Sequence, residues 1–220
     1  MFEIIQEIKD FGLYLGNCIS QEDIDEILEL SKSDLLEKGS SRLGSHVVIH
    51  EGNEWHEYLK QYSNEEEGED LKISKKVFSK IHPVMIKAMQ VYTDHFGLDI
   101  SKYTMAKQVY WIKTYDIGAF IGYHSDSWES DGETIVPAVS IVLYLSSDFE
   151  GGELVFVERD DLVFVDSESV HKATSIMQKN NDIVIKPSAG HVAIFDANAI
   201  HKVSPVISGT RISTDITYLN

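Results

Sequence analysis

The chain has two patterns of hydrophobic and polar residues, which meet near residue 100. From Ser20 to Phe96, apolar side chains recur at the spacing of an amphipathic helix. A first helix is predicted after Ser20, which forms a capping-box pattern with Asp23. Its apolar face would consist of Ile24, Ile27, Leu28 and Leu35.

The periodicity fades between Arg42 and Tyr62, and residues 64–70 are a charged loop broken by glycine. A second helical stretch is predicted from about Leu71. Pro83 would either start a new helix within it or kink it.

After Tyr103 the pattern changes to short runs of β-forming residues separated by Gly, Pro and Asp. Seven or more short strands closed by turns indicate an antiparallel sandwich or barrel. Alternation along the first run predicts that Trp111 belongs to the core. The predicted strands are Val109–Tyr115, Ala138–Leu145, Glu153–Val157, Leu162–Val165, Ile183–Ile185, His191–Phe195 and Arg211–Tyr218.

Composition limits the classes of function. At 220 residues and 43% hydrophobic, the chain can bury a full core in one domain. A net charge of −17 disfavours binding to nucleic acid or to anionic membranes, and it is typical of a solvated acidic surface. The lone Cys18 excludes an internal disulfide, and we expect it to be buried.

The first ten residues carry acids where a signal peptide has a basic start, and no apolar run approaches the ~20 residues of a membrane span. We therefore expect a cytoplasmic protein. Nothing in the sequence specifies its oligomeric state.

The most informative chemistry lies in His124-Ser-Asp126, His201 and Arg211. Two imidazoles and one carboxylate form the ligand set that holds Fe(II) on one face and leaves the other positions open. Alternation along a strand would point His124 and Asp126 to the same side. An arginine after the last ligand can form a planar pair with a dicarboxylate.

Three downstream histidines compete for the third ligand position. His171 lies in a polar stretch that reads as a loop, and His191 follows Ala-Gly at the start of a strand. His201 lies where a short turn leads onto a new strand, and only it has a basic residue, Arg211, at a suitable distance. The sequence therefore favours His201.

These residues resemble the 2-oxoglutarate and Fe(II)-dependent dioxygenases of the prolyl 4-hydroxylase type. The resemblance covers roughly residues 103–218, with a weaker echo at 12–30, and the segment 158–181 gives no family signal. It rests on three stretches, which are Gln108–Gly118 leading to His124-x-Asp126, then Val142–Phe156, and finally Ile185–Arg211.

The resemblance implies an α+β fold in which a double-stranded β-helix, or jelly roll, carries the metal in its mouth and N-terminal helices buttress one sheet. Residues 1–102 would be this strand and helical support, within the same domain as a catalytic core at 103–220. Fe(II), 2-oxoglutarate and dioxygen would be the cofactors, and ascorbate is a further candidate. Tyr115 and Tyr144 would hydrogen-bond 2-oxoglutarate, although both also suit the role of core aromatics. Arg211 would pair with the distal carboxylate.

The implied activity is hydroxylation of an unactivated carbon, with a peptidyl prolyl residue expected first. Collagen-type members usually carry Lys at the position of Arg211, which argues against a collagen-like substrate. A free amino acid, a small metabolite, a lysyl side chain and a non-catalytic metal-binding jelly roll stay open. So does the loop Ser127–Glu133, where Trp128 could line a substrate entrance beneath a lid or lie in an ordinary solvated loop.

Overall fold

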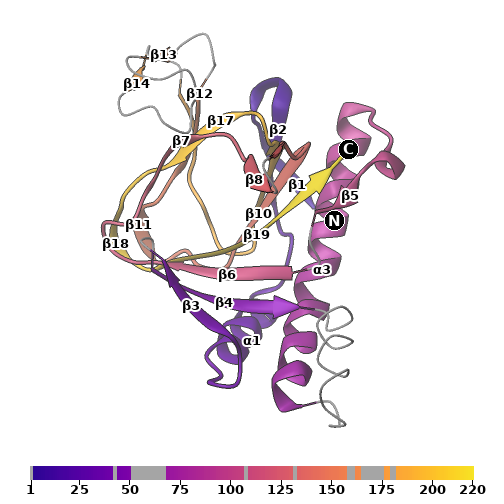
Figure 1. Ribbon diagram of the computed structural model, residues 1–220, viewed down its shortest axis with the longest axis vertical. Helices are drawn as coiled ribbons and strands as arrows, with labels where there is room; N and C mark the ends of the chain where they lie inside the picture. The colour runs from indigo at the N-terminus through magenta and orange to yellow at the C-terminus, as the bar shows by residue number, and fades with distance from the viewer. Residues whose placement is uncertain are drawn as a thin grey trace.

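A computed structural model describes residues 2–41, 44–50, 68–106, 109–130, 133–157, 162–164, 176–178 and 182–220. Its helices are α1 (Gln21–Ser31) and α3 (Glu69–Phe96), with short 3-10 turns at Lys9–Phe11 and Ile100–Lys102. Two facing sheets form the rest of the body, and the helices cover the outer side of the larger one (Figure 1).

The larger sheet has nine strands in the order β1-β2-β16-β10-β19-β6-β4-β3, with β5 also paired to β19. All its pairings are antiparallel. The strands are β1 (Glu3–Glu7), β2 (Gly12–Gly16), β3 (Lys38–Ser41), β4 (Gly44–His50), β5 (Thr104–Met105), β6 (Val109–Tyr115), β10 (Val139–Tyr144), β16 (Val192–Asp196) and β19 (Arg211–Leu219).

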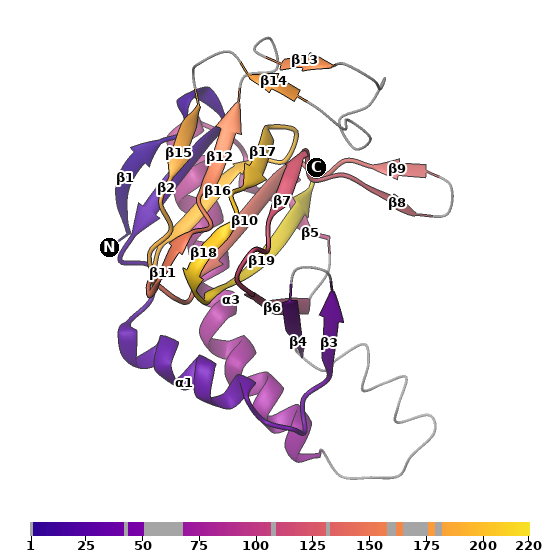
Figure 2. The same cartoon turned by 90° about the vertical axis from the view of Figure 1, so that its left-hand side faces the viewer.

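The smaller sheet has the order β15-β12-β17-β7 and faces the larger one (Figure 2). Its strands are β7 (Ile121–His124), β12 (Leu154–Val157), β15 (Ile183–Ile185) and β17 (Ile200–Val203). Three further pairs are β8 (Trp128–Ser130) with β9 (Glu133–Ile135), β11 (Phe149–Gly151) with β18 (Val206–Gly209), and β13 (Leu162–Phe164) with β14 (Ile176–Gln178). The predicted double-stranded β-helix with buttressing helices is confirmed.

Alternation along the central strand β10 explains how the two layers of core form. One set of its side chains packs with α3 in the main hydrophobic core, and the other set faces the interior between the two sheets. The helix-facing set is Val139, Ile141 and Leu143, and the interior set is Ser140, Val142 and Tyr144. The interior side of β10 is therefore more polar than the side that packs on α3.

Helix α1 begins where the sequence predicts. The Ser20 hydroxyl accepts from the Asp23 backbone N–H at 3.1 Å and donates to the Asp23 carboxylate at 2.7 Å. The helix ends at Ser31, so Leu35 lies beyond it and is 58% exposed, and its predicted place on the apolar face is wrong.

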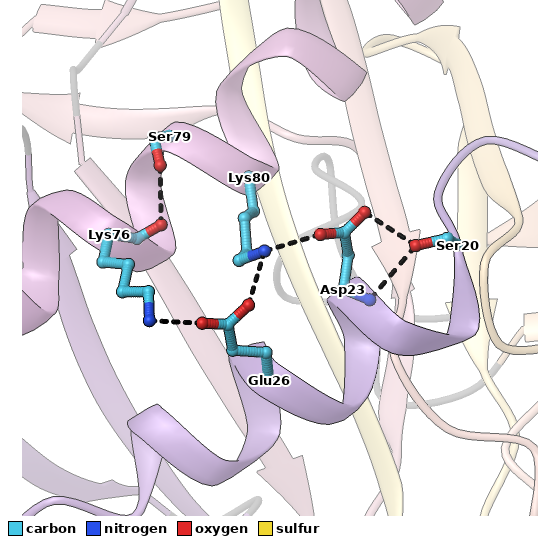
Figure 3. A network of polar contacts seen from close by, with 6 residues as sticks. All are labelled: Ser20, Asp23, Glu26, Lys76, Ser79 and Lys80. Carbon is cyan, nitrogen blue, oxygen red and sulfur yellow. Dashed lines mark hydrogen bonds and ion pairs between the residues drawn. The ribbon is translucent and has the colours of Figure 1, made fainter.

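Ion pairs join the exposed sides of α1 and α3 (Figure 3). The Lys80 ammonium lies 2.6 Å from Asp23 Oδ1 and 2.7 Å from Glu26 Oε2, and Lys76 also pairs with Glu26. Helix α3 runs without interruption through Pro83, so Pro83 does not start a new helix. In the described part of the chain, α3 included, no helix is long and apolar enough to cross a membrane.

The seven predicted strands occur within one or two residues of their expected ends. Strands β3 and β4 were not predicted, and they extend the large sheet because β4 pairs with β6 along its whole length. Cys18 is buried, as expected. Trp111 is not in the core, because it is 44% exposed, lines the cavity described below and stacks on His46.

Candidate active site

Two histidines from neighbouring strands lie side by side in the smaller sheet. His124 ends β7, and His201 follows the first residue of β17. The two are paired in the antiparallel register, and their ring centroids are 4.2 Å apart. His201 is almost fully buried and is flanked by the rings of Phe156 and Phe195.

The Asp126 carboxylate completes this group. Its Oδ1 lies 3.4 Å from His124 Nε2 and 3.6 Å from His201 Nε2. The expectation that it shares a strand with His124 is wrong, because β7 ends at His124. Asp126 is held instead by its backbone N–H, which donates to the carbonyl of Ala197 in the turn before β17. That turn therefore positions two of the three side chains.

Backbone carbonyls orient both imidazole rings. His124 Nδ1 lies 2.9 Å from the Gly122 oxygen, and His201 Nδ1 lies 2.9 Å from the Ala199 oxygen. A carbonyl can only accept, so each Nδ1 carries the proton and each neutral ring keeps a lone pair on Nε2. Both lone pairs are then free for a metal beside the carboxylate, and the three ligand atoms lie within 4.8 Å of one another.

Burial and the contacts within the group shift the pKa values of all three side chains. Burial opposes ionisation of Asp126, but the His201 and His124 rings outweigh it and hold the pKa of that carboxyl well below its usual range. Burial lowers the pKa of His201 and so favours the neutral ring. Burial acts the same way on His124, but its contact with Asp126 prevails and raises the pKa of His124.

A cavity of about 330 Å³ lies between the two sheets and contains all three side chains in its wall. Much of the opposite wall consists of alternate side chains of β6 and β19. From β6 these are Val109, Trp111, Lys113 and Tyr115, and from β19 they are Arg211, Ser213, Asp215 and Thr217.

Arg211 lies in this wall and is 2% exposed. Its Nε donates to the Gly152 carbonyl at 3.1 Å, and its Nη1 donates to Ser213 Oγ at 3.2 Å. Among the residues that the structure describes, no Asp or Glu forms an ion pair with it. A buried guanidinium without a counter-ion favours an anionic ligand, and its remaining N–H groups suit a carboxylate. A Cβ on Gly152 would lie 2.8 Å from Arg211 Cδ, so glycine there keeps the side chain in place.

The rings of Tyr115 and Tyr144 both lie close to this guanidinium. The Arg211 Cζ is 4.3 Å from the ring centroid of Tyr115 and 5.3 Å from that of Tyr144. The Tyr144 hydroxyl is buried without a hydrogen-bond partner in the described part of the chain, and burial raises its pKa to about 12. A buried hydroxyl without a partner in the described residues, beside a buried cation without a counter-ion there, suits an anionic ligand with polar oxygens.

The other two histidines considered as ligands do not join the group in the described structure. His191 Nδ1 lies 3.1 Å from the Tyr14 hydroxyl, and His191 is not part of the cluster of ligand atoms formed by His124, Asp126 and His201. His171 lies outside the described residues, as does most of the segment 158–181. The loop after Asp126 forms the hairpin β8–β9, which projects from the body (Figure 2), and whether it acts as a lid stays a prediction.

An ion pair inside the cavity was not predicted from the sequence. Lys113 Nζ lies 2.6 Å from Asp215 Oδ1, and both side chains line the same wall as Arg211. The signal was present, because Lys113 and Asp215 share the odd-numbered face of their strands with Tyr115 and Arg211.

Residues 110–217 match the family model described as the 2OG-Fe(II) oxygenase superfamily. No curated protein matches the chain. The matched segment includes the three clustered side chains, Arg211 and both tyrosines.

Several solved structures share the fold at low sequence identity. A 2OG-Fe(II) oxygenase family oxidoreductase from Burkholderia pseudomallei is 17% identical with a TM-score of 0.60, over 94% of this chain and 84% of that one. A prolyl hydroxylase from Trichoplax adhaerens, in complex with a hypoxia inducible factor peptide fragment, is 12% identical with a TM-score of 0.58, over 96% and 84%. A viral collagen prolyl hydroxylase from Paramecium Bursaria Chlorella virus-1 is 16% identical with a TM-score of 0.51, over 93% of each chain.

Proposed function

Because residues 110–217 belong to the 2OG-Fe(II) oxygenase superfamily, we propose that His124, Asp126 and His201 hold the Fe(II) of this dioxygenase. One observation carries the proposal. The Nε2 lone pairs of His124 and His201 and the ionised carboxylate of Asp126 lie close together in one wall of the cavity. That donor set fits Fe(II) and leaves positions for other ligands. The carbonyls of Gly122 and Ala199 fix the orientation of both rings.

Arg211, Tyr115 and Tyr144 are proposed to bind 2-oxoglutarate. The Arg211 guanidinium would form a bidentate pair with the carboxylate far from the metal, and the Tyr144 hydroxyl would donate to the same ligand. The Tyr115 ring also packs against the guanidinium. The apolar side chains of Val142, Leu154 and Val203 line the cavity and would exclude water from the pair formed by Arg211 and the co-substrate carboxylate.

When bound, iron and 2-oxoglutarate reduce dioxygen, with one oxygen atom leaving in succinate, carbon dioxide released, and the other atom inserted into a substrate C–H bond. The protein contributes orientation and a shielded cavity. It places the metal ligands on the smaller sheet and the co-substrate contacts on the larger one, so that both reactants meet between the sheets.

A peptidyl prolyl residue is the first substrate that we propose. This proposal draws on the order of the motifs from His124 to Arg211 and on the fold shared with the prolyl hydroxylase of Trichoplax adhaerens. A free amino acid or small metabolite is the second candidate. It is favoured by the Lys113–Asp215 ion pair in the cavity wall, where a prolyl ring would meet charge rather than apolar surface.

The dioxygenase proposal is tested by following succinate formation and oxygen consumption with Fe(II), 2-oxoglutarate and ascorbate, with and without prolyl peptides and free amino acids. Succinate formation that needs both iron and 2-oxoglutarate, and that is lost in His201→Ala but retained in His191→Ala, supports it. Iron retention by His201→Ala at the wild-type level would refute the assigned ligands.

A further inference from the structure

Two charged side chains in the cavity have no role in holding the metal or the co-substrate. Lys113 and Asp215 are paired at 2.6 Å, and their side chains are 29% and 36% exposed. Both belong to the cavity wall, so the exposed atoms face the space where a substrate would lie. Burial opposes the charge on Lys113, but Asp215, with further contributions from Tyr115 and Asp126, outweighs burial and raises the pKa of Lys113, so Lys113 is charged at neutral pH.

The strand register places the pair next to the co-substrate contacts. Arg211 is opposite Tyr115, and two residues along each strand Ser213 is opposite Lys113. Asp215 lies two residues further along β19, on the same face. The pair is therefore the next layer of the wall along the strands from Arg211.

The metal ligands lie on the facing sheet. His124 and His201 belong to β7 and β17, whereas Lys113 and Asp215 belong to β6 and β19. The ion pair and the three ligand side chains nevertheless line one and the same cavity. A molecule held by the pair would thus extend across the cavity toward the iron.

A substrate that fills the cavity removes water from these charges. An apolar group would leave them desolvated and poorly satisfied, which is costly for charged side chains. A molecule with both an ammonium and a carboxylate would satisfy them, because each of its charges can lie against the opposite charge of the pair. In an α-amino acid both groups are attached to one carbon, so they are close enough together to contact one ion pair.

We infer that Lys113 and Asp215 bind the zwitterionic head group of a free amino acid, with Lys113 contacting its carboxylate and Asp215 its ammonium. The amino-acid side chain then points toward the metal wall, where a carbon of it is hydroxylated. This inference rests on the proposed function and selects the second substrate candidate. A prolyl residue inside a peptide has neither charge and no N–H, so it would satisfy the pair less well.

The test is an anaerobic calorimetric titration of the protein loaded with Fe(II) and 2-oxoglutarate. The free L-amino acids, L-proline included, are titrated first, and the tightest-binding one is compared with its methyl ester and its N-acetyl derivative. The ester lacks the carboxylate and the acetyl derivative lacks the ammonium. Each should bind about 10- to 100-fold more weakly than the free amino acid.

Two variants should remove these penalties separately. In Lys113→Met the free acid and the ester should bind with nearly equal affinity, whereas the penalty for acetylation persists. In Asp215→Asn the free amino acid and its N-acetyl derivative should bind with nearly equal affinity, whereas the penalty for esterification persists. Because each comparison is made within one variant, a general loss of stability cannot produce the crossed pattern. Lys32→Met breaks a similar ion pair on the exposed end of α1, with Glu29, and should leave every ratio unchanged.

The inference is overturned if no free amino acid binds to the loaded protein, or if an N-acetylated, C-amidated prolyl peptide binds more tightly than any of them. It is also overturned if the methyl ester and the N-acetyl derivative lose affinity equally in Lys113→Met and in Asp215→Asn. The ion pair would then only stabilise the pairing of the strands. These outcomes concern only the substrate. Failure of the proposed function would appear earlier, as an absence of 2-oxoglutarate binding to the iron-loaded protein.

Discussion

Replacing Arg211 with Met should separate binding of 2-oxoglutarate from folding. The substitution removes the guanidinium and keeps an unbranched apolar stem of similar width. Arg211 is 2% exposed, and two of its N–H groups are used by Gly152 and Ser213. The others remain for the carboxylate that we propose as its partner.

The magnitude follows from the burial of this cation. Breaking a buried, charge-assisted pair costs about 2–5 kcal/mol, which corresponds to a roughly 30- to 5,000-fold higher dissociation constant for 2-oxoglutarate. In the absence of co-substrate the effect should differ. Arg211 then lies in the protein without a paired carboxylate among the described residues, so its removal also removes a desolvation penalty. The melting temperature of the ligand-free variant should therefore be unchanged or higher.

The assay is calorimetric titration of the Fe(II)-loaded protein with 2-oxoglutarate under nitrogen, combined with thermal unfolding with and without the co-substrate. Lys202→Met is the matched control, because it removes a cation on β17 that contacts the Tyr123 ring and does not line the cavity. Iron binding should survive in both variants. Equal half-saturation by 2-oxoglutarate in Arg211→Met and wild type would refute the reasoning and make Arg211 a structural residue.

His201→Ala should abolish iron binding measured by metal analysis, whereas His191→Ala should keep it, because only the first removes a ligand atom from the cluster. Tyr144→Phe removes a buried hydroxyl without a partner in the described residues, so the ligand-free protein should be at least as stable in urea while its affinity for 2-oxoglutarate falls about 5- to 30-fold. Lys80→Met should lower the melting temperature more than Lys87→Met at neutral pH. Lys80 holds the pKa of Asp23 below its usual 3.8, and Lys76 and Lys80 hold the pKa of Glu26 below its usual 4.5, so the stabilisation is fully present above those values and is lost as the pH falls through the lowered ones. The difference in melting temperature between the two variants should therefore be smaller at pH 3 than at pH 7, and an equal difference at both would contradict this.

Much of this architecture follows from local patterns. The strands that were predicted contain β-branched and aromatic runs with clear ends, and Ser20 marks the start of α1 because its side chain caps the helix directly. Strand β3 lacks such a run, since Lys38–Ser41 is mostly Gly and Ser. Strand β4 contains the short run Val47–Ile49, but polar and Gly residues precede it, and no turn signal marked it as a strand. Both strands join the large sheet through the pairing of β4 with β6, whose residues are far away in the sequence.

Trp111 and Lys113 show the physical limit of reading alternation. Period-2 alternation correctly groups them on one face of β6, but it does not say whether that face meets helices or an open cavity. In this fold the even-numbered face, with Tyr110 and Ile112, packs on the helix side, and the odd-numbered face carries large aromatic and charged side chains into the cavity. The local pattern of β6 would place its more polar face toward solvent, whereas the fold places that face inside. Such conflicts between local pattern and burial concentrate at functional sites, and here the conflict coincides with the residues that we propose to bind co-substrate and substrate.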